Sequence, residues 1–144
     1  MRFFKRITAF ALILSLSVFF CLAIAILPNR LLFCGGESYR FYLGDTSLNC
    51  KEVFADSVLA PLLRLTLRDI NGESATYKQL DISTFLKSVN GEILFLEEVE
   101  GSKNYYCKAD LPYSVNLYGK QINLHICVSE RGITVASPII FGGY

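Results

Sequence analysis

His125 and Cys127 are the residues of this chain whose types and spacing come nearest to a reactive site. His125 is the only histidine, and it lies two positions before Cys127. Side chains two apart on a strand project from the same face, so this pair could supply a zinc site or a thiol nucleophile with its base. Further ligands would have to come from a neighbouring strand, for example from Cys107. The spacing matches neither CxxC nor HExxH, so a half-exposed strand face is the simpler interpretation.

Two other polar groups could hold an ion. Glu97, Glu98 and Glu100 form the densest acidic group, but the segment lacks the spaced oxygen ligands and central glycine of a calcium loop. Residues 44–47 (Gly-Asp-Thr-Ser) contain a single glycine, which favours an ordinary turn over a phosphate loop. The chain also lacks GxSxG, Walker and dinucleotide-binding motifs. The sequence therefore predicts no catalytic, cofactor-binding or metal-binding residue.

The N-terminal segment that would position the rest of the chain carries the strongest signal. Three basic residues in 2–6 precede an uncharged apolar run over 7–27. A helix of about 20 apolar residues spans a bilayer core of roughly 30 Å. Positive charges before the run orient the N-terminus toward the cytoplasm. Residues 1–29 are therefore predicted to be a signal-anchor of a single-pass membrane protein, with an extracytoplasmic C-terminal domain.

A cleaved secretory signal is the alternative. Ala23, Ile24 and Ala25 form the small-x-small pattern that signal peptidase accepts, and the residues before the run are basic. Cleavage after Ala25 would release a secreted domain. The apolar run is longer than the usual signal-peptide core of about 7–15 residues, which favours the uncleaved anchor.

The remaining chain has the size of one ordinary domain. Residues 30–37, which include Gly35 and Gly36, are predicted to be a linker, and residues 38–144 the domain. After the leader, 11 Lys plus Arg stand against 13 Asp plus Glu. A nucleic-acid site would show clustered basic residues, so no nucleic-acid partner is expected.

Four cysteines follow the leader, namely Cys34, Cys50, Cys107 and Cys127. In an exported domain an even number permits two disulfides, in three connectivities. Each bridge would contribute about 2–4 kcal/mol. The same cysteines can equally be buried apolar side chains, which is common for free thiols. The spacing does not decide between the two interpretations.

One amphipathic helix is expected over Ile82–Val89, capped by Asp81 and ended by residues 90–91. Alternating patterns and turn residues predict strands on either side of it. The predicted strands are 38–43, 48–54, 63–68 and 73–78, with an Asn71-Gly72 hairpin between the last two, followed by 92–99, 103–109, 113–118, 121–129 and 133–141. Short connections favour hairpins, so the fold class is α+β, with an antiparallel meander and the helix packed on one face.

Tyrosines on the predicted strand faces are the candidate interaction surface, because exposed tyrosine often anchors interfaces. The four are Tyr105, Tyr106, Tyr113 and Tyr118, and cross-strand packing is the alternative role for each. The expected function is a membrane-anchored, non-enzymatic binding or interaction module of the cell envelope. Its partners would be the membrane, through residues 7–27, and an envelope or membrane protein. A secreted, disulfide-stabilised domain and, less favoured, an envelope hydrolase are the alternatives.

Two C-terminal segments carry a resemblance to a known family. They are INLHICV at 122–128 and ASPIIFGGY at 136–144, about the last quarter of the chain. They resemble the C-terminal signature of YwmB-like exported proteins of spore-forming Firmicutes. The resemblance implies an exported α+β domain like the TATA-box-binding fold, and no activity. DNA binding does not follow from that fold, because this domain is slightly acidic and is expected outside the cytoplasm.

Overall fold

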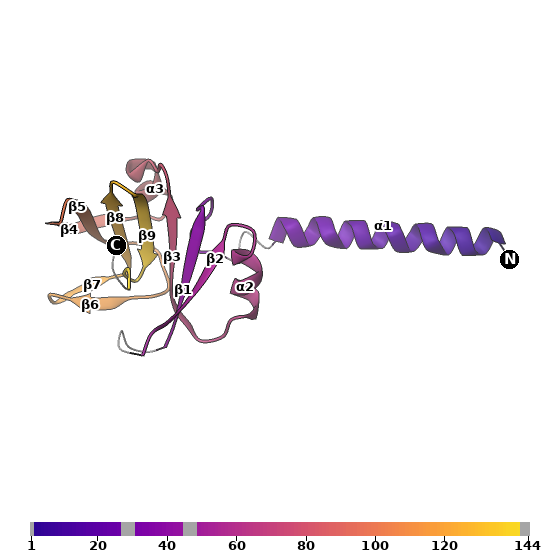
Figure 1. Cartoon of the computed structure of the whole chain (residues 1–144), viewed down its shortest axis with the longest axis horizontal. Helices are drawn as coiled ribbons and strands as arrows, with labels where there is room; N and C mark the ends of the chain where they lie inside the picture. The colour runs from indigo at the N-terminus through magenta and orange to yellow at the C-terminus, as the bar shows by residue number, and fades with distance from the viewer. Residues whose placement is uncertain (1, 27–30, 45–48, 142–144) are drawn as a thin grey trace.

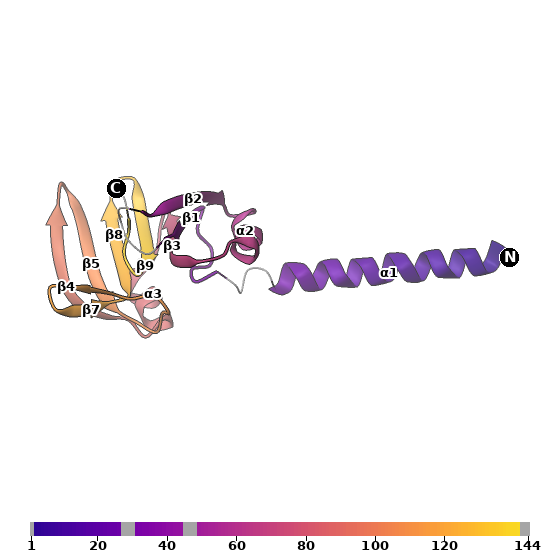
Figure 2. The ribbon, with the colours of Figure 1, turned by 90° about the horizontal axis from the view of Figure 1, so that it is seen from below.

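The computed structural model describes residues 2–26, 31–44 and 49–141, with side chains in the first helix described over 10–23. Helix α1 (Arg2–Ile26) forms a rod that stands clear of the domain (Figures 1 and 2). Its apolar side chains, such as Phe10 and Phe19, are 71% exposed. Among the described residues, no helix combines the length and the hydropathy needed to cross a membrane.

The domain is built on a seven-stranded sheet whose strands run in the order β2-β1-β3-β9-β8-β5-β4. Every pairing in this sheet is antiparallel. The sheet strands are β1 (Ser38–Leu43), β2 (Lys51–Asp56), β3 (Ile70–Tyr77), β4 (Glu92–Val99), β5 (Ser102–Lys108), β8 (Leu124–Ser129) and β9 (Gly132–Ser137). A separate hairpin pairs β6 (Val115–Leu117) with β7 (Lys120–Ile122). Helices α2 (Ala60–Thr66) and α3 (Ile82–Ser88) complete the domain.

The predicted α+β class with an antiparallel sheet is confirmed, but the meander is wrong. Strand β3 pairs with the last strand, β9, and not with the next one along the chain. After β3 the chain passes through α3 to the far edge, forms the β4–β5 hairpin there and returns through β8 to β9. Short connections identify the local pairs β4–β5 and β8–β9, but they cannot reveal the long-range pairing of β3 with β9.

Helix α3 matches the amphipathic helix expected from the sequence. The Asp81 side chain accepts a hydrogen bond from the Ser83 N–H at 3.1 Å, which caps the first turn. At the other end Asn90 has a φ of 50°, and the Gly91 N–H donates to the Leu86 carbonyl at 2.7 Å. The left-handed residue that ends the helix is therefore Asn90, a residue that tolerates this conformation.

Residues 63–68, predicted as a strand, instead belong mainly to α2. Leucine and arginine are strong helix formers, and the segment contains few β-branched residues that would favour a strand. The Asp56 carboxylate accepts hydrogen bonds from the Val58 and Leu59 N–H groups and fixes the entry to the helix. Pro61 lies in the first turn, where a missing N–H has no cost. The proline that suggested an interruption thus marks a helix start.

The predicted Asn71-Gly72 hairpin turn is also wrong, because both residues lie inside β3. Tyr42 pairs with Gly72 and Leu43 pairs with Ile70, so Asn71 is the extra residue of a β-bulge. A Cβ on Gly72 would come within 2.8 Å of the Ser137 carbonyl oxygen. Glycine serves close strand packing here.

The predicted strand 121–129 is divided at Asn123. The Asn123 Oδ1 accepts from the Ala109 N–H at 2.6 Å, and Nδ2 donates to the Ala109 and Leu111 carbonyls. The Asn123 side chain therefore satisfies backbone groups of the segment that follows β5. Asn123 itself lies between the end of β7 and the start of β8.

One face of the sheet, here called the core face, packs against α3, α2 and residues 31–36. It presents buried apolar side chains such as Phe41, Ile126 and Val135. The expected linker takes part in this core, because Leu31 and Phe33 are 9% and 1% exposed and the Phe33 ring lies 6.0 Å from that of Phe85. Burial of large apolar side chains is favourable, so this segment packs into the core and is not an exposed linker.

Candidate functional site

The opposite face of the sheet, here called the polar face, carries a row of small polar side chains. Ser38 pairs with Thr76, Thr76 with Thr134, and Thr134 with Cys127. Because successive residues of a strand point to opposite faces, these paired residues share one face, and neighbours such as Tyr39, Ala75 and Val135 point into the core. A neighbouring row contains Arg40 paired with Ser74.

A cavity of about 250 Å³ lies over these rows. Its lining contains two guanidinium groups, from Arg40 and Arg131, together with the Cys127 thiol and the apolar side chain of Ile140. The remaining side chains that line it carry hydroxyl groups, and they are Ser38, Tyr42, Ser74, Thr76, Ser129 and Thr134. Such a lining can donate and accept many hydrogen bonds and includes two positively charged side chains.

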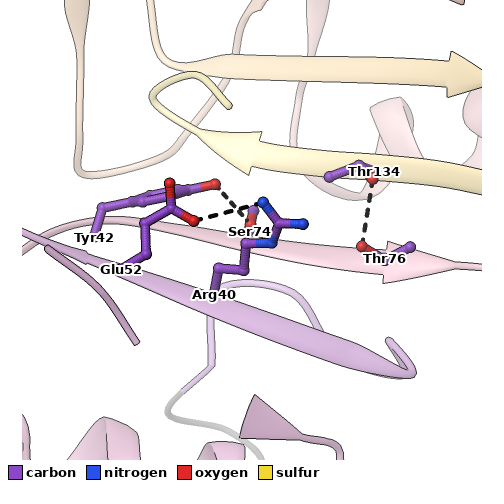
Figure 3. Close-up of polar contacts among 6 residues, drawn as sticks. All are labelled: Arg40, Tyr42, Glu52, Ser74, Thr76 and Thr134. Atoms are coloured by element: carbon purple, nitrogen blue, oxygen red, sulfur yellow. Dashed lines mark hydrogen bonds and ion pairs between the residues drawn. The ribbon is translucent and has the colours of Figure 1, made fainter. Parts of the chain in front are cut away.

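Hydrogen bonds between strands hold several of these hydroxyls in place (Figure 3). The Tyr42 and Ser74 hydroxyls are 3.0 Å apart, and the Thr76 and Thr134 hydroxyls are 3.3 Å apart. Tyr42 and Ser74 are each 1% exposed, and burial raises the pKa of the Tyr42 phenol. The phenol therefore stays protonated and acts as a neutral hydrogen-bonding group.

Arg40 is positioned by two contacts on its own edge of the sheet. Its Nη1 lies 3.5 Å from the Glu52 Oε2, and its guanidinium carbon lies 4.9 Å from the centre of the Phe54 ring. Both Arg40 and Glu52 are partly exposed, so this ion pair contributes little to stability. Arginine in such a place can exchange a carboxylate of the protein for one of a ligand.

The segment after β9 forms one wall of the cavity. Pro138 cannot continue the ladder, because it lacks an N–H, and the chain then crosses the polar face. The Phe141 ring meets the Tyr42 ring edge-on with centroids 5.0 Å apart. The Ile140 N–H donates to His125 Nδ1 at 3.2 Å.

His125 lies next to this wall as a buried structural residue. The half-exposed position expected from the sequence is wrong, since the side chain is 2% exposed. With Nδ1 accepting from Ile140, the proton resides on Nε2, which donates to the Asn104 Oδ1 at 3.1 Å. The ring stacks on Tyr106 at 4.5 Å, and Tyr106 stacks on Phe95 at 4.6 Å. Burial lowers the His125 pKa to about 4, so the imidazole is neutral at pH 7.

Cys127 lines the cavity without the features of a nucleophile. The side chain is 2% exposed, and burial raises the pKa of its thiol, whereas reactive cysteines are thiolates at neutral pH. Both His125 nitrogens already have partners, so neither is placed as a base for this thiol. Within the described residues, no three His, Cys, Asp or Glu side chains gather as a metal site would require. The arrangement favours binding of a polar molecule over thiol or zinc chemistry.

No family model, curated protein or solved structure matches this chain.

The four candidate tyrosines do not share one surface. Tyr105 and Tyr113 pack against the core, and the Tyr113 hydroxyl accepts from Arg64 Nη2 at 3.1 Å. Tyr106 is half-buried in the stack with Phe95 and His125. Tyr118 is 78% exposed and meets the Phe95 ring edge-on at 5.9 Å. Tyr106 therefore takes part in cross-strand packing, and only Tyr118 of the four is largely exposed.

The cysteines that were candidates for disulfides are distributed over both faces of the sheet. Cys50, Cys107 and Cys127 are free thiols. Cys107 pairs with Leu124 and belongs to the core face, whereas Cys127 pairs with Thr134 on the polar face. A bridge between Cys107 and Cys127 would have to pass through the sheet. Cys34, the fourth candidate, is exposed, and its carbonyl accepts from the Tyr77 hydroxyl at 3.0 Å.

Sequence reasoning did not find the cavity, although part of its signal was present. Ser38, Arg40 and Tyr42 alternate with apolar residues, and so do Cys127 and Ser129. These patterns predict a polar face for each strand separately. Only the pairing of β3 with β9 brings the rows together, and no local pattern indicated that pairing.

Proposed function

We propose that this protein is a membrane-anchored, extracytoplasmic binding module that holds a small anionic, hydroxyl-rich ligand in the cavity on its polar face. The observation that carries the proposal is the cavity lining, in which six hydroxyl side chains surround a pocket bordered by Arg40 and Arg131. Hydroxyl groups match a polyol or sugar skeleton, and a guanidinium group matches a carboxylate or phosphate. A cavity of about 250 Å³ suits one sugar-sized unit.

A binding role is favoured over catalysis by the protonation states around the cavity. The Cys127 thiol and the Tyr42 phenol are both held neutral by burial, and His125 is neutral with both nitrogens hydrogen-bonded. General acid–base catalysis needs a group that changes protonation near the working pH and can reach the substrate. None of these three groups changes its protonation near pH 7.

Two features support the anchored placement. The leader is uncharged from Ile7 to Leu27, and α1 carries its described apolar side chains on the outside. The positions of Cys107 and Cys127 on opposite faces also weaken the secreted, disulfide-stabilised alternative. The YwmB-like resemblance stays a prediction that agrees with an exported domain.

The anchor is tested by the mass and membrane partition of the expressed full-length protein. An intact mass in the membrane fraction supports it. A chain in the medium that begins near Ile26 contradicts it and establishes cleavage after Ala25. The measurement is repeated with and without reducing agent, because a mass change on reduction would identify disulfides.

The ligand class is tested with glucuronate and glucose, which differ mainly in one carboxylate. We expect glucuronate to shift the amide NMR signals of Thr76 and Thr134, and glucose to shift them much less at the same concentration. Arg40→Gln should weaken the glucuronate response, whereas Arg68→Gln, an exposed arginine outside the cavity, should leave it unchanged. Equal responses to both sugars, or shifts confined to residues away from β3 and β9, would rule out the proposed site.

A further inference from the structure

The short helix α2 has apolar side chains on both of its faces. Inward, Ala60 is fully buried and Leu63 packs against the core. Outward, four large apolar side chains of α2 and of the turn before it are exposed by about half or more: Val58 by 81%, Leu59 by 50%, Leu62 by 52% and Leu65 by 48%. Large apolar side chains gathered on the exposed side of a helix mark a surface that contacts a partner or a membrane. The outer surface formed by Val58, Leu59, Leu62 and Leu65 is here called the α2 outer face.

Specific contacts link α2 to the segment that follows α1 and enters the domain. The Leu32 N–H donates to the Glu73 Oε1 at 2.9 Å, and the other carboxylate oxygen lies 3.3 Å from Arg64 Nε on α2. Leu31 and Leu63 also belong to the same apolar cluster. The segment that enters the domain from α1 is therefore fixed beside α2.

The length of the connection limits how far α2 can lie from the end of α1. Helix α1 ends at Ile26, and Leu31 is already buried in the domain. The chain between these two residues can span no more than about 18 Å when fully extended. Both views place α2 at the end of the domain nearest α1 (Figures 1 and 2). If α1 is embedded in a bilayer, the α2 outer face lies within reach of the bilayer surface.

We infer that the α2 outer face inserts into the lipid surface from which α1 emerges, so that the domain sits on the bilayer in a fixed orientation. This inference depends on the membrane anchor of the proposed function. Amphipathic helices bind in this way with their apolar face at the boundary between headgroups and acyl chains. Leucine and valine gain from that transfer as they do from burial in a core. The ligand cavity, on the opposite face of the sheet from α2, then stays open to solvent.

Tryptophan fluorescence tests this inference in the full-length protein, because the native chain contains no tryptophan. Three single variants, Leu62→Trp, Phe19→Trp in α1 and Tyr118→Trp at the exposed β6–β7 turn, are reconstituted in phosphatidylcholine–phosphatidylglycerol vesicles. Each is compared in vesicles with and without brominated acyl chains, which quench tryptophan at the depth of the lipid tails. We expect loss of emission for Leu62→Trp and Phe19→Trp, and no loss for Tyr118→Trp.

The outcomes separate this inference from the anchor. Quenching of Phe19→Trp without quenching of Leu62→Trp would overturn the lipid contact and leave the anchor intact. No quenching of Phe19→Trp would show that the anchor itself is wrong. A blue-shifted but unquenched Leu62→Trp would mean that protein, such as a second copy of the chain, covers the α2 outer face, and this too overturns the inference. If Leu62→Trp perturbs folding, judged by circular dichroism, Leu65→Trp provides the same test on the next turn.

Discussion

The Glu73 Oε2 atom lies 3.3 Å from the Arg64 Nε atom in the interior of the domain, where Glu73 is fully buried. Its other carboxylate oxygen accepts from the Leu32 N–H. One side chain of β3 thus links α2 to the segment that arrives from α1. The Arg64 Nε and Glu73 Oε2 atoms are within ion-pair distance but are not aligned as a hydrogen bond. Burial outweighs this contact and raises the Glu73 pKa to about 7.

Glu73 should make the folded domain less stable as the pH rises. The unfolded carboxyl releases its proton near pH 4.5, whereas the folded one keeps it to about pH 7. Between these values the native carboxyl binds more protons, so the contribution of Glu73 to the free energy of unfolding falls with pH, by up to about 3 kcal/mol. We expect Glu73→Gln to remove this falling contribution, so that the free energy of unfolding of the variant rises with pH relative to that of the wild type, measured by urea unfolding from pH 4 to pH 8. An unchanged pH profile in the variant would contradict the raised pKa.

His125 should produce the opposite slope. Its pKa falls from 6.5 to about 4 on folding, so its contribution is fully present above pH 6.5 and is lost as the pH falls toward 4. The two slopes oppose each other between about pH 4.5 and 6.5, and the wild-type profile should be nearly flat there. His125→Asn should reveal the falling Glu73 profile, and Glu73→Gln the rising His125 profile. Parallel profiles in the two variants would show that other groups dominate.

Removal of the Arg64 charge should raise the Glu73 pKa further. Arg64 is one of the groups that lower it, against the larger effect of burial. Arg64→Met retains most of the apolar side-chain volume and removes the charge. The titration of the Glu73 carboxyl carbon, followed by NMR, should move to higher pH. Arg68→Met, which removes an exposed arginine just beyond the end of α2, is the matched control and should leave the titration of Glu73 unchanged.

Glycine at position 72 should be required for close packing of β3. A Cβ there would lie 2.8 Å from the Ser137 carbonyl oxygen and 3.0 Å from the Tyr42 ring. We expect Gly72→Ala to lower the free energy of unfolding by about 1–3 kcal/mol. Gly91→Ala is the comparison, because its Cβ would meet the end of the flexible Leu86 side chain, which can move aside. A larger loss in the free energy of unfolding for Gly91→Ala than for Gly72→Ala would contradict the proposed role of the close contact between position 72 and Ser137.

The sequence predicts the features of this fold that depend on neighbouring residues, and it does not predict those that depend on residues far apart in the chain. Asp81 and the apolar spacing that follows it predict α3 because a cap and a helix face are local features. The pattern over 63–68 misleads because alternating leucines fit a helix as well as a strand. Asn71-Gly72 misleads because a bulge uses the same residue types as a turn. The candidate site needs the pairing of β3 with β9, which joins residues about 60 positions apart and has no local signature.

The reactivity of the buried thiols should distinguish this domain from one that is cross-linked by disulfides. Cys107 is fully buried with its pKa raised by burial to about 12, and Cys127 is 2% exposed with a raised pKa. A thiol reagent reacts with the thiolate, so both cysteines should resist a maleimide in the native protein and react after unfolding in urea. Mass spectrometry of the peptides counts the adducts at each position. Cys50, which is half-buried, should be modified faster than either and serves as the internal control. Failure of Cys107 and Cys127 to react after unfolding until a reducing agent is added would reveal disulfides and contradict the assignment of both residues as free thiols.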